Sequence, residues 1–229
     1  YLLFCTDPLT PSKILDDNGS CIEKKNYLGS SGKLTMFFKK PVEWKKEKAL
    51  ETSFRFVFSQ DTLDGLNDSG QMALNSQNNY TPGYIQIYPD GAAQRKLNNS
   101  ENFDKIICFT KNFSFNKNSD DLIYAEQNII EKISKLISNP EDLVGTKFIT
   151  PKDLNEVFFF PKGNIDHLAM DGSQNFEKRT FSSDPKNNFY NYSNYENIFC
   201  GGAGTFPCGS VSGTAGYMSS KQIIKKNKC

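Results

Sequence analysis

The sequence predicts a β-rich α+β protein: an antiparallel β-sandwich or barrel-like domain that carries one main amphipathic helix and is stapled by disulfides. Short apolar runs recur between turn signals, one apolar stripe with helical spacing covers residues 119–138, and the chain contains six cysteines. With 229 residues, we expect a single extracellular domain over 1–229. A possible subdivision separates a β-rich part, 1–115, from a part, 116–229, that holds the helix, a β-hairpin and a stapled C-terminal segment.

The strands are expected at four apolar runs, which follow an N-terminal stretch rich in turn signals. These runs are residues 34–38, 53–58, 84–88 and 105–109. In the second run Phe54, Phe56 and Phe58 occupy alternate positions, so the three rings share one face of a strand. Strands at such short intervals are typical of an antiparallel sandwich or barrel.

Two proline-x-glycine turns predict β-hairpins. The turn at 89–91 follows the run 84–88, and the turn at 161–163 follows a further strand signal at 157–160. Proline fixes φ at the first turn position and glycine tolerates a left-handed conformation, so both sites favour a reversal between two strands.

One segment has the period of a helix. Ser119 can cap its N-terminus, acidic residues suit its first turn, and Asn139-Pro140 ends it. We expect its apolar stripe to pack on the core. The stripe consists of Leu122, Ile123, Ile129, Ile130, Ile133, Leu136 and Ile137. A second, short helix is expected to start at Thr150-Pro151, because proline suits the first helical position.

The cysteines predict a secreted or cell-surface protein. They are Cys5, Cys21, Cys108, Cys200, Cys208 and Cys229. No C-x-x-C pair occurs, which removes the commonest zinc and redox signatures. We expect three disulfides in an oxidising compartment, with Cys5 and Cys21 stapling the N-terminal segment and Cys200 and Cys208 able to close a loop. Buried thiols in a cytosolic protein are the alternative.

Two further features agree with this compartment. The chain begins at Tyr1 without a Met, so we expect a processed form. Six N-x-S/T sequons are candidate glycosylation sites, at Asn18, Asn67, Asn79, Asn98, Asn112 and Asn191. A composition rich in Asn and Lys is an equally simple explanation for their number.

The glycine-rich segment 200–216 fits none of the catalytic loops that its composition suggests. No Lys follows its glycines as a phosphate-binding loop requires, the G-x-G-x-x-G spacing is absent, and its serines are displaced from the position of a nucleophile elbow. We interpret it as a segment that disulfides cross-link and that holds the C-terminal residues on the domain. The single histidine, His167, excludes a two-His zinc site, and no catalytic residue is identified.

Charge and hydropathy limit the expected partners. Lys and Arg number 27 and Asp and Glu 26, which leaves a net charge of +1. This balance gives no electrostatic footprint for nucleic acid, so no nucleic-acid partner is expected. No apolar run approaches the length of a membrane-spanning helix, so no membrane span is expected.

Two stretches offer candidate binding residues. The first could hold calcium through oxygen ligands at Asp61, Asp64, Asn67 and Asp68. An ordinary polar loop is the alternative there, and no other cofactor is expected. The second combines rings and amides, a composition typical of adaptable binding surfaces, at Tyr190, Tyr192, Asn194 and Tyr195.

These observations predict a non-catalytic recognition or adhesion domain that binds a protein or a glycan on another surface. A structural subunit of an extracellular filament or coat, formed by self-association of exposed strands, is the first alternative. A polysaccharide hydrolase that uses a pair of carboxylates is the second.

Overall fold

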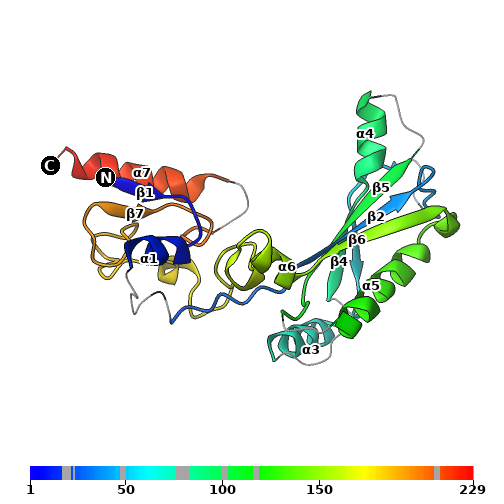
Figure 1. The fold of residues 1–229 in the computed structure, drawn as a ribbon, viewed down its shortest axis with the longest axis horizontal. Coiled ribbons are helices and arrows are strands. Elements are labelled where there is room, and N and C mark those ends of the chain that lie inside the picture. Colours follow the sequence, from blue (N-terminus) through cyan, green and yellow to red (C-terminus); the bar gives the residue numbers. More distant parts are fainter. Residues whose placement is uncertain are drawn as a thin grey trace. The chain divides into compact units, whose positions relative to one another are not determined.

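The computed structural model describes residues 1–16, 22, 24–46, 50–75, 83–98, 103–115, 119–208 and 212–228 (Figure 1). The chain forms two compact units, unit 1 from Tyr1–Gly29 with Leu154–Cys229 and unit 2 from Ser30–Asp153. The possible boundary at residue 115 that the sequence suggested falls inside unit 2.

Unit 2 is built around a five-stranded antiparallel sheet with the strand order β3-β4-β5-β2-β6. Its elements are β2 (Gly32–Phe38), β3 (Arg55–Phe58), α3 (Leu63–Leu74), β4 (Tyr84–Tyr88), α4 (Asp90–Asn98), β5 (Asp104–Thr110), α5 (Ser119–Ser134), a 3-10 turn (Pro140–Asp142) and β6 (Leu143–Ile149). The short helix α6 (Pro151–Glu156) follows β6. The helices α3 and α4 lie at opposite ends of the sheet (Figure 1), because they follow two antiparallel strands.

The register of the sheet divides its side chains between an inner and an outer face. In β2, Leu34, Met36 and Phe38 are buried on the inner face, whereas Lys33 and Phe37 are exposed on the outer face. Helix α5 completes the inner core with Ile129, Ile133 and Ile137, which are fully buried. The other core residues of unit 2 are Val42, Trp44, Ile85, Ile87, Ile106 and Cys108.

Unit 1 contains a two-stranded parallel sheet formed by the two ends of the chain, β1 (Leu2–Phe4) and β7 (Ile198–Cys200). Helix α1 (Leu9–Leu15) follows β1, and helix α7 (Thr214–Lys226) follows β7. Two 3-10 turns, Pro161–Gly163 and Phe176–Lys178, lie between these ends in the sequence. The core gathers Ile22, Tyr27, Leu168, Phe181, Tyr192, Ile198 and Cys200.

The expected sandwich or barrel is wrong. The described residues form an α+β fold in which a helix, rather than a second sheet, closes the inner face of an open five-stranded sheet. The first predicted hairpin fails because Asp90 begins α4, where its carboxylate suits the positive end of the helix dipole. A proline-acid-glycine sequence fits a helix start as well as a tight turn.

Around residue 160 the prediction of a strand is also wrong. Helix α6 starts at Pro151 as expected, and Thr150 and Asp153 exchange hydrogen bonds across its first turn, with distances of 2.8 and 3.1 Å. The chain then continues through Phe159, whose φ is 58°, without forming a strand. The main helix α5 ends at Ser134 rather than at 138, and Ile123 of the predicted stripe is exposed.

The predicted disulfide staples are wrong for the described cysteines. No two of Cys5, Cys108, Cys200 and Cys208 are at bonding distance, while Cys21 and Cys229 lie outside the described residues. Cys108 and Cys200 instead serve as small core side chains of their units. The extracellular location stays a prediction, and disulfides no longer support it. Among the helices that the structure describes, none has the length and apolar character needed to cross a membrane.

Candidate functional site

Five aromatic rings form a continuous cluster on the outer side of β3 and β4, and we call this cluster the aromatic face. It consists of Phe54, Phe56, Phe58, Tyr84 and Tyr88. The exposed fraction of its phenylalanines is 50% for Phe54, 41% for Phe56 and 58% for Phe58. Exposed aromatic clusters of this kind mark interaction sites, because single scattered apolar side chains are the norm on a protein surface.

The rings of the aromatic face contact one another along and across the strands. The centroid of Phe56 lies 4.8 Å from those of Phe58 and Tyr84, and the Phe56 and Tyr84 planes are inclined by only 30°. Phe54 lies 5.1 Å from Tyr88. The sheet register produces this arrangement, because Phe58 is directly opposite Tyr84. The alternation of Phe54, Phe56 and Phe58 in the sequence correctly indicated a shared face of a strand.

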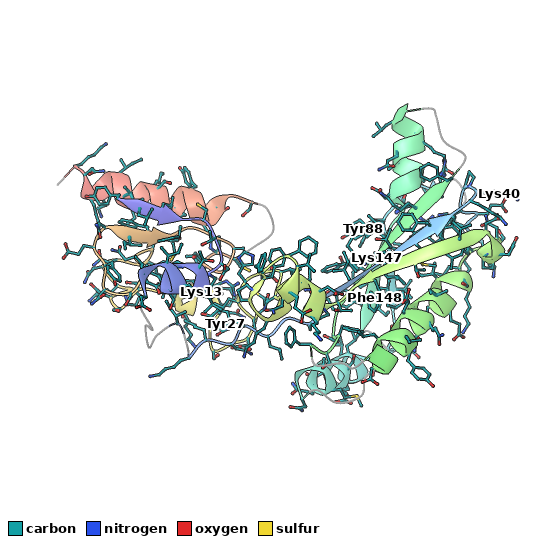
Figure 2. All side chains as sticks on the ribbon, viewed as in Figure 1. Lys13, Tyr27, Lys40, Tyr88, Lys147 and Phe148 are labelled. Atoms are coloured by element: carbon teal, nitrogen blue, oxygen red, sulfur yellow. The ribbon has the colours of Figure 1, made fainter. Side chains whose placement is uncertain are left out.

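Four lysines lie on the outer face of the same sheet, on or next to strands β5, β2 and β6 rather than on the two strands that carry the rings. They are Lys33, Lys105, Lys111 and Lys147, and Figure 2 labels Lys147 together with Tyr88. The Lys111 ammonium lies 5.3 Å from the ring centroid of Phe109, and it also donates to Ser31 at 2.8 Å. The Lys105 ammonium is 2.6 Å from the carboxylate of Asp90. The outer face therefore combines aromatic rings with an excess of positive charge.

A groove of about 510 Å³ extends the aromatic face along the free edge of β3, and we call it the β3 groove. Its lining includes Trp44, Lys45, Lys46, Phe54, Arg55 and Lys135. Among the described residues that line it, none carries a carboxylate. Lys45 and Lys135 are positioned by local bonds, since Lys45 donates to the Lys135 carbonyl at 3.1 Å and Lys135 pairs with Glu131 at 2.6 Å.

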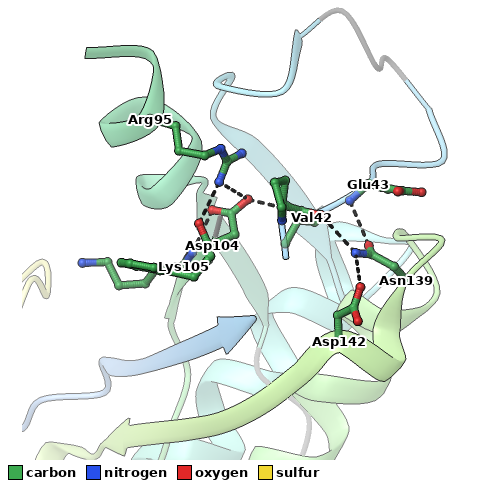
Figure 3. A network of polar contacts seen from close by, with 9 residues as sticks. Val42, Glu43, Arg95, Asp104, Lys105, Asn139 and Asp142 are labelled. Carbon is green, nitrogen blue, oxygen red and sulfur yellow. Dashed lines mark hydrogen bonds and ion pairs between the residues drawn. The ribbon is translucent and has the colours of Figure 1, made fainter. Parts of the chain in front are cut away.

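A network of buried polar groups holds the chain segment that follows β2 and leads to this groove (Figure 3). The Asp104 carboxylate accepts the Val42 amide at 2.9 Å and pairs with Arg95 at 3.0 Å. The Asn139 side chain accepts the Glu43 amide at 2.9 Å and donates to Asp142 at 3.0 Å. Because buried polar groups are costly when unpaired, this network fixes the path of the backbone at Val42 and Glu43.

The carboxylate of Asp142 belongs to the same network. Its side chain is 5% exposed and lies 3.3 Å from the Lys39 ammonium. The hydrogen bond from Asn139 lowers the pKa of Asp142 below its ordinary value, and Lys39 and Lys40 act in the same direction. The network therefore stabilises the ionised form of Asp142 in the folded state.

The predicted aromatic binding residues lie in unit 1, and two of them belong to its interior. Tyr192 is completely buried and Tyr190 is 6% exposed. Tyr195 is half-buried and its ring stacks on that of Tyr192 at a centroid distance of 6.1 Å, whereas Asn194 is exposed. Burial leaves Tyr190 and Tyr192 little surface for contact with a partner.

The candidate calcium ligands occupy the start and the middle of α3. Asp61 precedes the helix, Thr62 caps it by accepting the Gly65 amide at 3.0 Å, and Asp64 lies in its first turn. Asn67 and Asp68 follow within the helix. Within the described ranges, no group of three or more His, Cys, Asp or Glu side chains could hold a metal ion. Thr62 caps the helix and Asp64 interacts favourably with the helix dipole, so both residues have a structural role that needs no calcium. The calcium site stays a prediction.

The sequons have different surroundings. Asn67 is exposed on α3, and the Asn112 amide donates to the Leu66 carbonyl at 3.3 Å. Asn191 is 3% exposed and its side chain bonds to Tyr195 and Gln222, each at 2.6 Å, so its amide is committed to the interior of unit 1. Asn98 ends α4. Asn18 and Asn79 lie outside the described residues.

A second cluster of polar groups surrounds His167 in unit 1. Burial lowers the pKa of His167, which lies 5.1 Å from the ring of Phe160. Arg179 is 1% exposed and donates to the carbonyls of Asp166 and Leu168 at 2.9 and 3.1 Å. The nearby Asp7 carboxylate caps α1 by accepting the Leu9 amide at 2.8 Å. These contacts give Arg179 and Asp7 structural roles.

Sequence reasoning missed the cations of the β3 groove. Lys135 lies eighty residues after Arg55 in the sequence, and no local pattern indicates that it meets Lys45 and Arg55. The chain matches no protein-family model, and no curated protein is found to be similar to it.

Proposed function

We propose that this chain is a non-catalytic recognition protein whose unit 2 binds an extended partner through the aromatic face and the β3 groove. The observation that carries the proposal is the unbroken contact of five rings on the solvent side of a sheet whose core lies on the other side. Aromatic side chains contribute most of the binding energy at many interfaces, so a cluster that adds nothing to the core favours recognition.

The shape of the surface supports an extended partner. Phe54 and Phe58 are four residues apart, which corresponds to about 13 Å along a strand. The β3 groove continues from these rings along the strand edge. A polymer with flat, repeating units fits such a surface, because each unit can stack on a ring.

The polysaccharide-hydrolase alternative gains no support from the buried carboxylates of unit 2. Asp104 and Asp142 use their oxygens for backbone amides, Arg95, Asn139 and Lys39. A general acid or nucleophile needs a carboxylate that faces the substrate.

Self-association has one observation in its favour, the free edge of β6. This seven-residue strand ends the sheet, and Val144, Gly145, Thr146 and Lys147 are exposed on it. An open edge can pair with a second chain, although an exposed Lys opposes this. Light scattering over increasing concentration tests it: growth of the particle mass supports a filament subunit, and a constant monomer mass contradicts it.

Binding to a panel of immobilised polymers tests the recognition proposal. The panel contains single-stranded DNA, heparin and a neutral β-glucan, and the full chain is compared with the variants Phe56→Ala and Ile123→Ala. We expect at least one polymer to bind the wild type, with loss of about tenfold in affinity for Phe56→Ala, since one stacked unit contributes about 1–3 kcal/mol.

The Ile123→Ala variant removes an exposed apolar side chain from α5 and is the matched control. It should bind as the wild type does. Absence of binding to every polymer at high micromolar concentration, or equal binding by Phe56→Ala and wild type, would contradict the proposal.

A further inference from the structure

The charges around the aromatic face define the chemistry of the partner. We propose that the aromatic face and the β3 groove bind single-stranded nucleic acid, with unpaired bases stacked on the rings and phosphates beside the surrounding cations. This inference rests on the proposed recognition function and narrows it to one class of polymer.

The rings provide the stacking surface that unpaired bases require. Phe56 has ring neighbours on both sides, Phe58 and Tyr84, each with a centroid distance of 4.8 Å. A strand segment from Phe54 to Phe58 spans about 13 Å, which gives room for two or three bases, as on other sheets that stack bases. Every base has a flat face, so such a surface binds with little sequence preference.

The cations provide the second half of the complementarity. Lys33 and Lys147 are exposed on the outer face, and Lys45 and Lys46 line the β3 groove together with Arg55. The aromatic face and the β3 groove share Phe54 and Phe56, so a polymer stacked on these rings has the groove cations beside it. A neutral glycan could use the rings but would give these cations no role.

Net charge conceals this arrangement, and the sequence-based expectation of no nucleic-acid partner depended on net charge. The total of +1 averages over all 229 residues. Association with a polyanion depends on the local potential instead. Four of the described side chains that line the groove are cations, Lys45, Lys46, Arg55 and Lys135, and Lys135 is paired with Glu131.

Stacking also separates single strands from duplexes. In a duplex the base faces are covered by neighbouring base pairs, so only the phosphates are available to the outer face. We therefore expect a preference for single strands, and the preference should depend on the rings rather than on the lysines.

Fluorescence anisotropy with labelled oligonucleotides tests the inference. The probes are single-stranded DNA and RNA of the same mixed sequence, about 16 nucleotides long, and the corresponding DNA duplex. We expect both single strands to bind the full chain more tightly than the duplex does. The Phe56→Ala variant should bind the single strands about tenfold more weakly than the wild type. The Ile123→Ala variant should bind them as the wild type does. A difference between DNA and RNA identifies which of them the surface prefers.

The salt dependence separates phosphate contacts from stacking. For single strands each phosphate contact contributes about 0.7 to the slope of log affinity against log salt. The double variant Lys45→Gln/Lys46→Gln should therefore reduce the slope by about 1.4. The double variant Lys221→Gln/Lys225→Gln on α7 changes the net charge equally, and it should keep the wild-type slope.

The outcomes distinguish this inference from the proposed function. If the neutral β-glucan binds in a Phe56-dependent way and neither single strand binds, the nucleic-acid inference is overturned and recognition stands. If heparin or vesicles of anionic phospholipid compete as well as single strands do, and Phe56→Ala binds as the wild type, the surface is a general polyanion site and the inference is overturned. If no polymer binds, both proposals fail. Each variant is first shown to unfold at the wild-type temperature, which excludes misfolding.

Discussion

The guanidinium of Arg55 lies over the indole of Trp44, with 3.8 Å between its central carbon and the ring centroid. Arg55 also donates to the carbonyls of Ser53 and Leu50, at 2.8 and 2.9 Å. The same side chain thus connects edge strand β3 with the segment after β2 and lines the β3 groove. Trp44 is 3% exposed beneath it. The floor of the groove is therefore part of the core of unit 2.

Replacement of Arg55 should change both stability and the fluorescence of the single tryptophan. Arg55→Ala removes a cation-π contact that contributes about 1 kcal/mol and opens Trp44 to water. We expect a lower urea midpoint and a red shift of the native emission. Arg55→Lys keeps the charge but loses the planar stacking, so it should restore only part of the stability. An unchanged midpoint and emission in Arg55→Ala would show that the contact contributes nothing.

The Asp104 network should be among the most sensitive points of unit 2. Asp104→Ala leaves the Arg95 guanidinium and the Val42 amide without their carboxylate, and the Asp104 side chain is only 2% exposed. We expect a loss of about 3 kcal/mol, because removing one partner leaves a largely buried charge uncompensated.

A double-mutant cycle measures how much of this loss of stability is due to the ion pair between Arg95 and Asp104. The double variant Arg95→Ala/Asp104→Ala should lose less free energy of unfolding than the two single variants lose in sum. If the losses of the two single variants add up to that of the double variant, the ion pair is not the reason for the large effect of Asp104→Ala.

Acid should destabilise unit 2 through Asp142. The hydrogen bond from Asn139, with the two lysines, places the folded-state pKa of Asp142 below the unfolded value of about 4. As the pH falls, the unfolded state takes up the proton first. The stabilisation is therefore complete above about pH 4 and is lost as the pH falls through the folded-state pKa.

Urea unfolding between pH 6 and pH 2 checks this expectation. The wild type should lose stability faster than Asp142→Asn below about pH 4. Glu51→Gln, a change of an exposed carboxylate before β3, controls for the removed charge. If the stability of the wild type and that of Asp142→Asn fall in parallel as the pH falls, Asp142 is not the cause of the acid destabilisation.

Local alternation correctly indicated four strands of the large sheet and the shared face of Phe54, Phe56 and Phe58. It could not indicate that this face is the outer one, because Ile85 and Ile87 of β4 alternate with Tyr84 and Tyr88, and both sides contain apolar groups. Only the position of α5 decides which side is buried. The sandwich was predicted from strands at short intervals, a pattern that does not show whether a helix or a second sheet covers the inner face.

Long-range pairing explains most of what the sequence did not predict. The parallel pair β1 and β7 joins residues nearly two hundred positions apart, without a local signal. The cations of the β3 groove meet through the same kind of contact, since Lys45 bonds to the carbonyl of Lys135. Cysteine counting failed for a different reason, because an even number of thiols is also compatible with separate core positions.

Thiol reactivity should distinguish the described cysteines from the disulfide framework that their number suggested. Cys5 is exposed, whereas Cys108 is fully buried among the core residues of unit 2. Burial raises the pKa of Cys108 to about 12, so at neutral pH its reactive thiolate is scarce as well as shielded. Native protein treated with iodoacetamide, without reductant, should be modified at Cys5 and not at Cys108. Unfolding in urea should make both react, and peptide mass spectrometry reads out each site. A Cys5 that reacts only after reduction would restore the disulfide hypothesis, and native modification of Cys108 would contradict its place in the core.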